Sequence, residues 1–104
     1  MQATPFEALA DPTRRELLDR LRHGGPMSLS QLAERLPMSR QAVTKHLDAL
    51  KRAGLVSITR RGRERLHSLN PAPLREVDDW LAPYAAAWDA RLLRLQQHLE
   101  EDSQ

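Results

Sequence analysis

Apolar residues recur every three or four positions along most of this chain, a spacing that is typical of amphipathic helices. The stretch DPTRRELLDRLRHGG carries such a stripe of leucines. Asp11 is suited to cap the N-terminus of this helix, Pro12 suits its first position, and Gly24-Gly25 suits its end. The preceding PFEAL predicts one more short helix.

A pair of helices is predicted over about residues 30–53. The stretch SLSQLAERL begins with serines that can cap a helix, and it predicts about two turns, which Pro37 ends. Ser39 then caps a longer helix that continues to about Ala53 and has Gly54 as its stop. Two helices joined by a turn of about three residues, the second with one polar face, have the outline of a helix-turn-helix.

The spacing changes over about residues 55–69. The stretch LVSITRRGRERLHSL contains β-branched residues and places Gly62 between two arginines. This combination predicts a β-hairpin whose turn lies at residues 61–63. A hairpin directly after a helix-turn-helix is known as a wing.

Helical spacing returns over about residues 71–101, where aromatic residues and leucines recur three or four positions apart. Pro83 cannot donate an N–H to the carbonyl of Asp79, so a break or kink is expected near residues 82–83. The whole pattern predicts a mainly α protein with a small β-hairpin (α+β). Its predicted architecture is a single winged helix-turn-helix domain over residues 1–104.

Charge is uneven along the chain, although the net charge is only +2. Residues 35–65 hold nine basic and two acidic side chains, a net of +7, whereas residues 70–104 carry −4. A basic block with near-neutral and acidic neighbours is typical of a surface that binds a polyanion. It favours double-stranded DNA as the partner over a plain solvated surface.

The polar face of the helix after Ser39 is the candidate for reading bases. Glutamine can pair with adenine through two hydrogen bonds, arginine and lysine prefer guanine, and a threonine methyl can contact that of thymine. The candidate residues in the recognition helix are Ser39, Arg40, Gln41, Thr44 and Lys45. Arginines around the wing tip can neutralise phosphates or enter the minor groove. They are Arg60, Arg61, Arg63 and Arg65.

Several other classes of protein are disfavoured. The chain has no cysteine, which excludes disulfides and thiolate metal sites. No apolar run approaches a membrane span and no secretory signal pattern is present, so a cytoplasmic protein without a membrane partner is expected. No catalytic or phosphate-binding motif is recognisable, so neither enzymatic activity nor a cofactor is expected. His46 is interpreted as a packed, hydrogen-bonded residue of the helix interior face.

Together these motifs resemble the ArsR/SmtB family of bacterial winged-helix transcriptional repressors. FEALADPTRRELLDRL resembles the N-terminal signature of that family, and the stretch from Ser28 to Leu69 resembles its helix-turn-helix and wing. The matching positions in the second stretch include Ser39, Val43, His46-Leu47, Leu50 and Gly54-Leu55-Val56. The resemblance implies a homodimeric repressor that binds a roughly palindromic operator.

In that family the first and last helices make the dimer interface. The corresponding residues here are Phe6, Leu9, Trp80, Tyr84, Trp88, Leu92 and Leu95. An interior role within one chain is the alternative, but so many large apolar residues exceed what one small domain can cover.

Two departures from the family pattern are visible. The metal-binding cysteines of many members are missing, and of a zinc motif in the last helix only His98 and Glu101 remain, with Ala85 and Ala87 at the other two positions. The chain therefore resembles the branch that does not sense metals, and its inducer is not identifiable. Pro37 stands where many helix-turn-helix units have a left-handed glycine, so this turn must use another geometry.

Two further functions are alternatives to DNA binding. One is a winged-helix module that binds another protein without reading DNA; the basic block argues against it, because lysine is depleted at the core of protein interfaces. The other is a metal-responsive repressor that uses His98, Glu101 and additional ligands.

Overall fold

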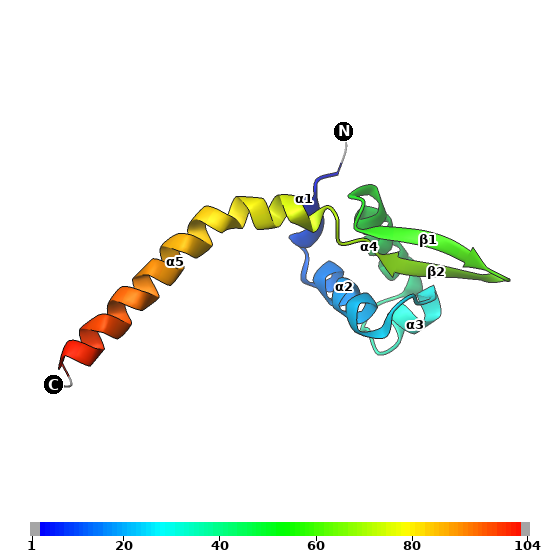
Figure 1. Cartoon of the computed structure of the whole chain (residues 1–104). Helices are drawn as coiled ribbons and strands as arrows, with labels where there is room; N and C mark the ends of the chain where they lie inside the picture. Colours follow the sequence, from blue (N-terminus) through cyan, green and yellow to red (C-terminus); the bar gives the residue numbers. More distant parts are fainter. Residues whose placement is uncertain (1–2, 103–104) are drawn as a thin grey trace. The chain divides into compact units, whose positions relative to one another are not determined.

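The computed structural model describes residues 3–102, and it divides into two units, one that ends at Leu74 and one that begins at Arg75. The architecture is mainly α with a two-stranded antiparallel hairpin, as the sequence predicts (Figure 1). The elements in chain order are α1 (Pro5–Leu9), α2 (Pro12–Gly24), α3 (Leu29–Ala33), α4 (Arg40–Arg52), β1 (Val56–Arg61), β2 (Glu64–Leu69) and α5 (Leu74–Asp102). The single domain over residues 1–104 stays a prediction.

The start and end of α2 follow the predicted signals. The Asp11 carboxylate accepts hydrogen bonds from the backbone N–H groups of Thr13 (2.7 Å) and Arg14 (3.3 Å), and Pro12 occupies the first turn. These bonds satisfy amides that have no partner inside the helix. The helix ends at Gly24, and Gly25 follows with φ +75°, a left-handed conformation that favours glycine.

The helix α3 is shorter than predicted. Ser28 and Gln31 form a reciprocal capping box at its start, but the helix ends at Ala33, before Leu36 and Pro37. The backbone turns at Arg35, whose φ of +65° is left-handed. A residue that precedes proline also avoids helical conformations, which keeps Leu36 out of the helix.

The turn between α3 and α4 therefore spans residues 34–39 rather than about three residues. The left-handed residue of this turn is Arg35, two positions before Pro37. The turn therefore differs from one with a left-handed glycine at position 37, as predicted, because proline cannot adopt a positive φ. The Arg20 side chain supports it by donating hydrogen bonds from Nη1 to the carbonyls of Leu32 (3.1 Å) and Glu34 (2.5 Å).

A leucine-rich core holds the helices of the N-terminal unit together, with α3 and α2 packed on α4. Three of its leucines, Leu17, Leu32 and Leu50, come from three different helices and are completely buried. Burying one such side chain contributes about 1.5–3 kcal/mol relative to leaving it exposed. The remaining core residues are Ala8, Leu18, Leu21, Val43, Leu47, Ala53, Leu55 and Val56.

The hairpin is anchored to the core at one end only. Val56 pairs with Leu69 and Ile58 with His67, so these residues share the inward face. A third segment joins there, because the backbone of Met27 exchanges two hydrogen bonds with His67, of 3.0 and 2.7 Å. The far end consists of exposed residues, so the wing projects beyond the core as a polar strip.

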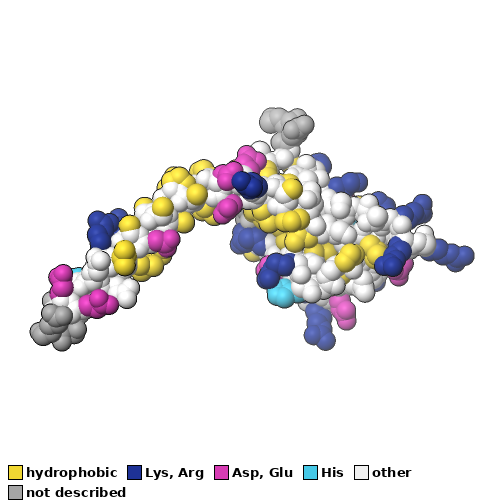
Figure 2. All heavy atoms as spheres, viewed as in Figure 1, with side chains coloured by type: hydrophobic (Ala, Val, Ile, Leu, Met, Phe, Trp, Pro, Cys, Tyr) yellow, Lys and Arg dark blue, Asp and Glu magenta, His cyan; other side chains and the backbone are white. Residues whose placement is uncertain are grey.

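The helix α5 is continuous from Leu74 to Asp102, so of the two outcomes expected near Pro83, a break or a kink, the structure excludes the break. The ribbon instead bends in the segment coloured yellow, which is the kink that the missing N–H of proline favours (Figure 1). Hydrophobic side chains run along this helix (Figure 2). In the part of the chain that the structure describes, no helix is long and apolar enough to cross a membrane.

Candidate nucleic-acid interface

The helix α4 has one buried face and one exposed polar face. Val43, Leu47 and Leu50 point into the core, which fixes the rotation of the helix about its own axis. The opposite face, here called the reading face, is exposed. It consists of Arg40, Gln41, Thr44, Lys45 and Asp48. The core thus dictates which side chains α4 can offer to a ligand.

Local hydrogen bonds order the first turns of α4. The Ser39 hydroxyl accepts a hydrogen bond from the backbone N–H of Ala42 at 3.1 Å, which makes Ser39 the N-cap as predicted. The Thr44 hydroxyl donates to the carbonyl of Arg40 at 2.9 Å. Because this bond fixes the side-chain rotamer of Thr44, its methyl group is presented in one orientation, as contact with a thymine methyl requires.

The hairpin register separates the four wing arginines into different positions. Arg60 lies directly opposite Arg65 on one face, Arg61 lies opposite Glu64 on the other, and Arg63 belongs to the loop at the tip. Gly62 has a positive φ of +64°, whereas the φ of Arg63 is not positive. A positive φ at only the first of the two turn residues is typical of a type II′ hairpin turn. Lys and Arg side chains gather around this tip in Figure 2.

The pairing of Arg60 with Arg65 has an electrostatic consequence. Like charges directly opposite each other on a hairpin destabilise it. A phosphate that lies between the two guanidinium groups would remove this repulsion, so the register favours an anionic ligand at the wing.

A cleft of about 160 Å³ lies between α4 and the wing. Thr44 and Asp48 line it from α4, and Ile58, Arg65 and His67 line it from the hairpin. The fold therefore brings one predicted wing arginine and one predicted reading residue to the same cleft. Arg60, Arg61 and Arg63 do not line it.

Two polar residues of this cleft were not among the predicted contacts. Asp48 lies four residues after Thr44, so the helical repeat alone places both on one face. His67 lines the cleft only because the hairpin register sets it beside Ile58, and its ring nitrogen Nδ1 lies 3.2 Å from the carbonyl of Met27. The spacing of residues along the chain does not predict the contact between His67 and Met27.

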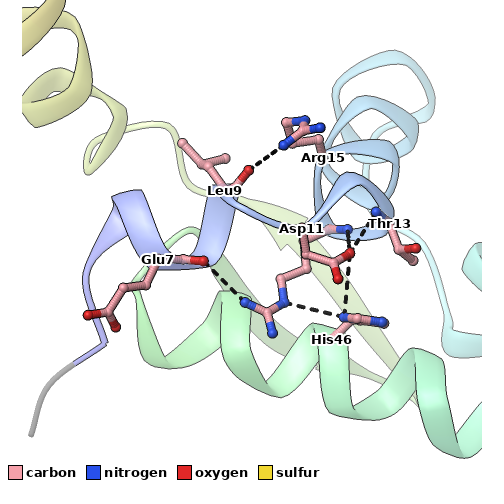
Figure 3. Close-up of polar contacts among 7 residues, drawn as sticks. Glu7, Leu9, Asp11, Thr13, Arg15 and His46 are labelled. Atoms are coloured by element: carbon pink, nitrogen blue, oxygen red, sulfur yellow. Dashed lines mark hydrogen bonds and ion pairs between the residues drawn. The ribbon is translucent and has the colours of Figure 1, made fainter.

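On the side of α4 that faces α2, His46 is hydrogen-bonded, as predicted. Arg14 donates from Nε to His46 Nδ1 at 3.3 Å, and Asp11 Oδ1 lies 4.0 Å from the same nitrogen (Figure 3). Partial loss of solvent raises the pKa of Asp11, but the backbone hydrogen bonds from Thr13 and Arg14 and the charges of His46 and Arg14 lower it further. The net result is a pKa below the ordinary value.

The predicted dimer-interface residues are exposed in the single chain, except for Leu9, which is half-buried. On α1, Phe6 is 38% exposed. On α5 the aromatic residues Trp80, Tyr84 and Trp88 are 55–62% exposed, and the Trp80 and Tyr84 rings lie 5.2 Å apart. Leu92 and Leu95 complete the predicted set and are 48% and 55% exposed.

His98 and Glu101, the remnant of a zinc motif, lie three residues apart near the end of α5. Among residues 3–102 no group of three or more His, Cys, Asp or Glu side chains is arranged to hold a metal ion. The described side chains therefore form no tetrahedral metal site.

Comparison with known proteins supplies independent information. A helix-turn-helix domain model matches residues 9–59. The transcriptional repressor SdpR of Bacillus subtilis is 38% identical over 76 residues, which cover 73% of this chain and 83% of SdpR. The HTH-type transcriptional regulator Rv2034 of Mycobacterium tuberculosis is 46% identical over 69 residues, or 66% of this chain and 64% of that protein.

A solved structure agrees with these sequence matches. The ArsR-like transcriptional regulator from Rhodococcus sp. RHA1 is 44% identical and superimposes with a TM-score of 0.65. The alignment covers 88% of this chain and 86% of the Rhodococcus protein. Fold, helix-turn-helix and wing thus recur together in a known regulator.

Proposed function

The chain belongs to the ArsR family of winged helix-turn-helix transcriptional regulators, and we propose that it is a homodimeric repressor that binds a roughly palindromic operator. DNA-binding transcriptional regulation is the function of the family. The dimer, the symmetry of the operator and the individual contacts are the parts proposed for this chain. The proposed site of action is the cytoplasm, where such an operator would lie.

The observation that carries the proposal is the exposed reading face on a helix whose other side is locked in the core. We assign readout of base edges in the major groove to Ser39, Arg40, Gln41, Thr44 and Lys45. We assign contacts with the backbone or the minor groove to Arg60, Arg61, Arg63 and Arg65. The repulsion between Arg60 and Arg65 supports a phosphate at the wing.

The proposed dimer rests on the exposed apolar residues of α1 and α5. These are Phe6, Leu9, Trp80, Tyr84, Trp88, Leu92 and Leu95. Large contiguous apolar patches on soluble proteins mark interaction sites. Two copies would present two recognition helices, which matches an operator of two half-sites about one helical turn apart, roughly 34 Å.

Selection of bound DNA from a random pool tests this proposal. The expected product is a pair of inverted half-sites. Variants at Gln41 or Thr44 should change the selected sequence, because these side chains are assigned to base edges. Selection of no preferred sequence at moderate salt would contradict the proposal and favour a module that binds protein.

The wing assignment has its own test in the salt dependence of binding. Replacing Arg63 by Gln should weaken binding to all duplexes and reduce the slope of log K against log salt by about one unit for each lost phosphate contact. Arg22→Gln is the matched control, because Arg22 is an exposed arginine of α2 outside the assigned surface. An Arg63→Gln slope equal to that of the control would remove the wing from the interface.

A further inference from the structure

Arg14 forms a bridge between three helices of the N-terminal unit. Its backbone N–H donates to the Asp11 carboxylate at the start of α2, its Nη1 donates to the carbonyl of Glu7 on α1 at 3.3 Å, and its Nε donates to His46 on α4 at 3.3 Å. In Figure 3, dashed lines lead to the backbone carbonyl of Glu7 and to the ring of His46 from the guanidinium group that lies between them. One side chain thus connects the short helix α1 with the recognition helix.

The chemistry of this bridge requires arginine. The guanidinium group is planar and presents donors in several fixed directions, so Nε and Nη1 can serve two acceptors on different helices at once. A lysine ammonium is a single point on a flexible stem and lacks this fork. Asp11 orders the bridge, since its carboxylate accepts the backbone N–H groups of both Thr13 and Arg14.

The acceptor on α4 is equally specific. The Nε–H of Arg14 can only donate, so Nδ1 of His46 is the acceptor in this hydrogen bond. His46 is about one-fifth exposed and comes directly after Lys45 of the reading face. On a helix of 3.6 residues per turn it lies roughly 160° from Thr44, on the opposite side. A rotation of α4 that moves His46 therefore moves the reading face by the same angle.

We propose that Arg14 and His46 are positioning residues that fix α4 relative to α1, and thereby set operator affinity without contacting DNA. The inference rests on the proposed function, because α1 carries Phe6 and Leu9 of the proposed dimer face and α4 carries the reading face. The spacing of two recognition helices in a dimer depends on the angle between these two elements. Arg14 of α2 links these two elements through its hydrogen bonds to the Glu7 carbonyl on α1 and to His46 on α4.

A pair of amide substitutions at His46 tests the acceptor. In His46→Asn the amide oxygen takes the place of Nδ1, whereas in His46→Gln it lies one bond farther out, near the place of Nε2. Asn should retain operator affinity within about twofold, and Gln should weaken it about tenfold, since only Asn preserves the acceptor. Affinity for an unrelated duplex and the salt slope should stay unchanged in both variants, because no phosphate contact is lost.

Arg14→Lys tests the donor. It should weaken the operator complex about tenfold, and the double variant Arg14→Lys/His46→Gln should be no weaker than either single variant, because the two residues act through one bond. Additive losses in the double variant would overturn the proposal. So would equal affinities of the Asn and Gln variants, or a loss in binding that merely follows a fall in the fraction of folded protein.

Measurement of the protein without DNA separates this proposal from the proposed function. Residual dipolar couplings of the backbone amides report the orientation of α4 relative to α1 and α2. They should change in Arg14→Lys and His46→Gln but not in His46→Asn. Unchanged couplings in all three variants would overturn the positioning role, whereas a wild-type protein without operator preference would overturn only the proposed function.

Discussion

The N-terminal unit and α5 share one hydrophobic periodicity but differ in what covers it. In the N-terminal unit Leu17, Leu32 and Leu50 are completely buried by neighbouring helices. In α5 the large apolar residues that recur at helical spacing are 48–62% exposed: Trp80, Tyr84, Trp88, Leu92, Leu95 and Leu99, here called the α5 stripe. A periodic pattern therefore identifies an apolar face, but it does not identify the partner of that face.

The same two regions differ in charge. Residues 35–65, which contain α4 and the wing, carry a net charge of +7, whereas residues 70–104 carry −4. A basic surface attracts the phosphate backbone and an acidic one is repelled by it. The charge distribution thus favours DNA contact through the first region, which agrees with the proposed role of the α5 stripe in contact with protein.

The largest expected effect concerns the α5 stripe. On a helix of 3.6 residues per turn the stripe lies within an arc of about 120°, and Leu93 lies roughly 100° beyond its edge. Leu95→Glu should raise the dissociation constant of the dimer by at least about 100-fold, because a charge would be buried in an apolar interface. Analytical ultracentrifugation measures this constant.

Leu93→Glu is the matched control for Leu95→Glu, because both leucines are 55% exposed on the same helix. It should change the dissociation constant less than about threefold, as surface substitutions usually do. An equal response of the two variants would mean that exposure alone, and not the stripe, determines association.

The second prediction tests the core of the N-terminal unit. Leu50→Ala should lower the free energy of unfolding by about 2–5 kcal/mol, because it removes buried methyl groups and leaves a cavity. The same change at Leu93, which is 55% exposed, should cost less than about 0.5 kcal/mol. Urea unfolding followed by circular dichroism gives both values, and similar losses at the two positions would contradict the contrast between the regions.

The third prediction concerns the bend at Pro83. Pro83→Ala restores an N–H for the carbonyl of Asp79, so helical content should rise in the monomeric Leu95→Glu background. In the otherwise natural chain it should weaken the dimer about tenfold, since a straighter helix moves Trp80 out of line with Leu92. A Pro83→Ala dimer as strong as the natural one would show that the bend plays no part in the interface.

The sequence predicted the elements whose signals are local. The caps at Asp11 and Ser39, the inward face of α4 and the glycine turn of the wing all follow from residues close together in the chain. The end of α3 could not be predicted in this way, because Leu36 continues the apolar spacing after the backbone has turned at Arg35. Side-chain spacing does not report a left-handed backbone.

Contacts between distant elements were equally inaccessible to the sequence. The hydrogen bond between Arg14 and His46 joins residues 32 positions apart, and the cleft between α4 and the wing depends on the hairpin register. The sequence also left open whether α5 breaks or bends at Pro83, because proline at an interior position is compatible with either outcome.

The smallest expected effect concerns the polar start of α2, where charge rather than apolar burial supports the N-terminal unit. Asp11 has a folded-state pKa below its ordinary value, so its carboxylate stabilises the fold above the unfolded-state pKa. Asn is also a good N-cap, so Asp11→Asn removes the charge and retains an acceptor. The natural chain should therefore be more stable than the variant at neutral pH.

The pH dependence of this difference is the diagnostic measurement. The advantage of the natural chain should be complete above about pH 5 and should disappear as the pH falls through the lowered folded-state pKa, where Asp11 becomes protonated in both states. Urea midpoints of the two proteins, measured across this range, should converge at the acidic end. A difference that stays constant with pH would mean that Asp11 acts only through the geometry of its cap and that its charge contributes nothing to α2.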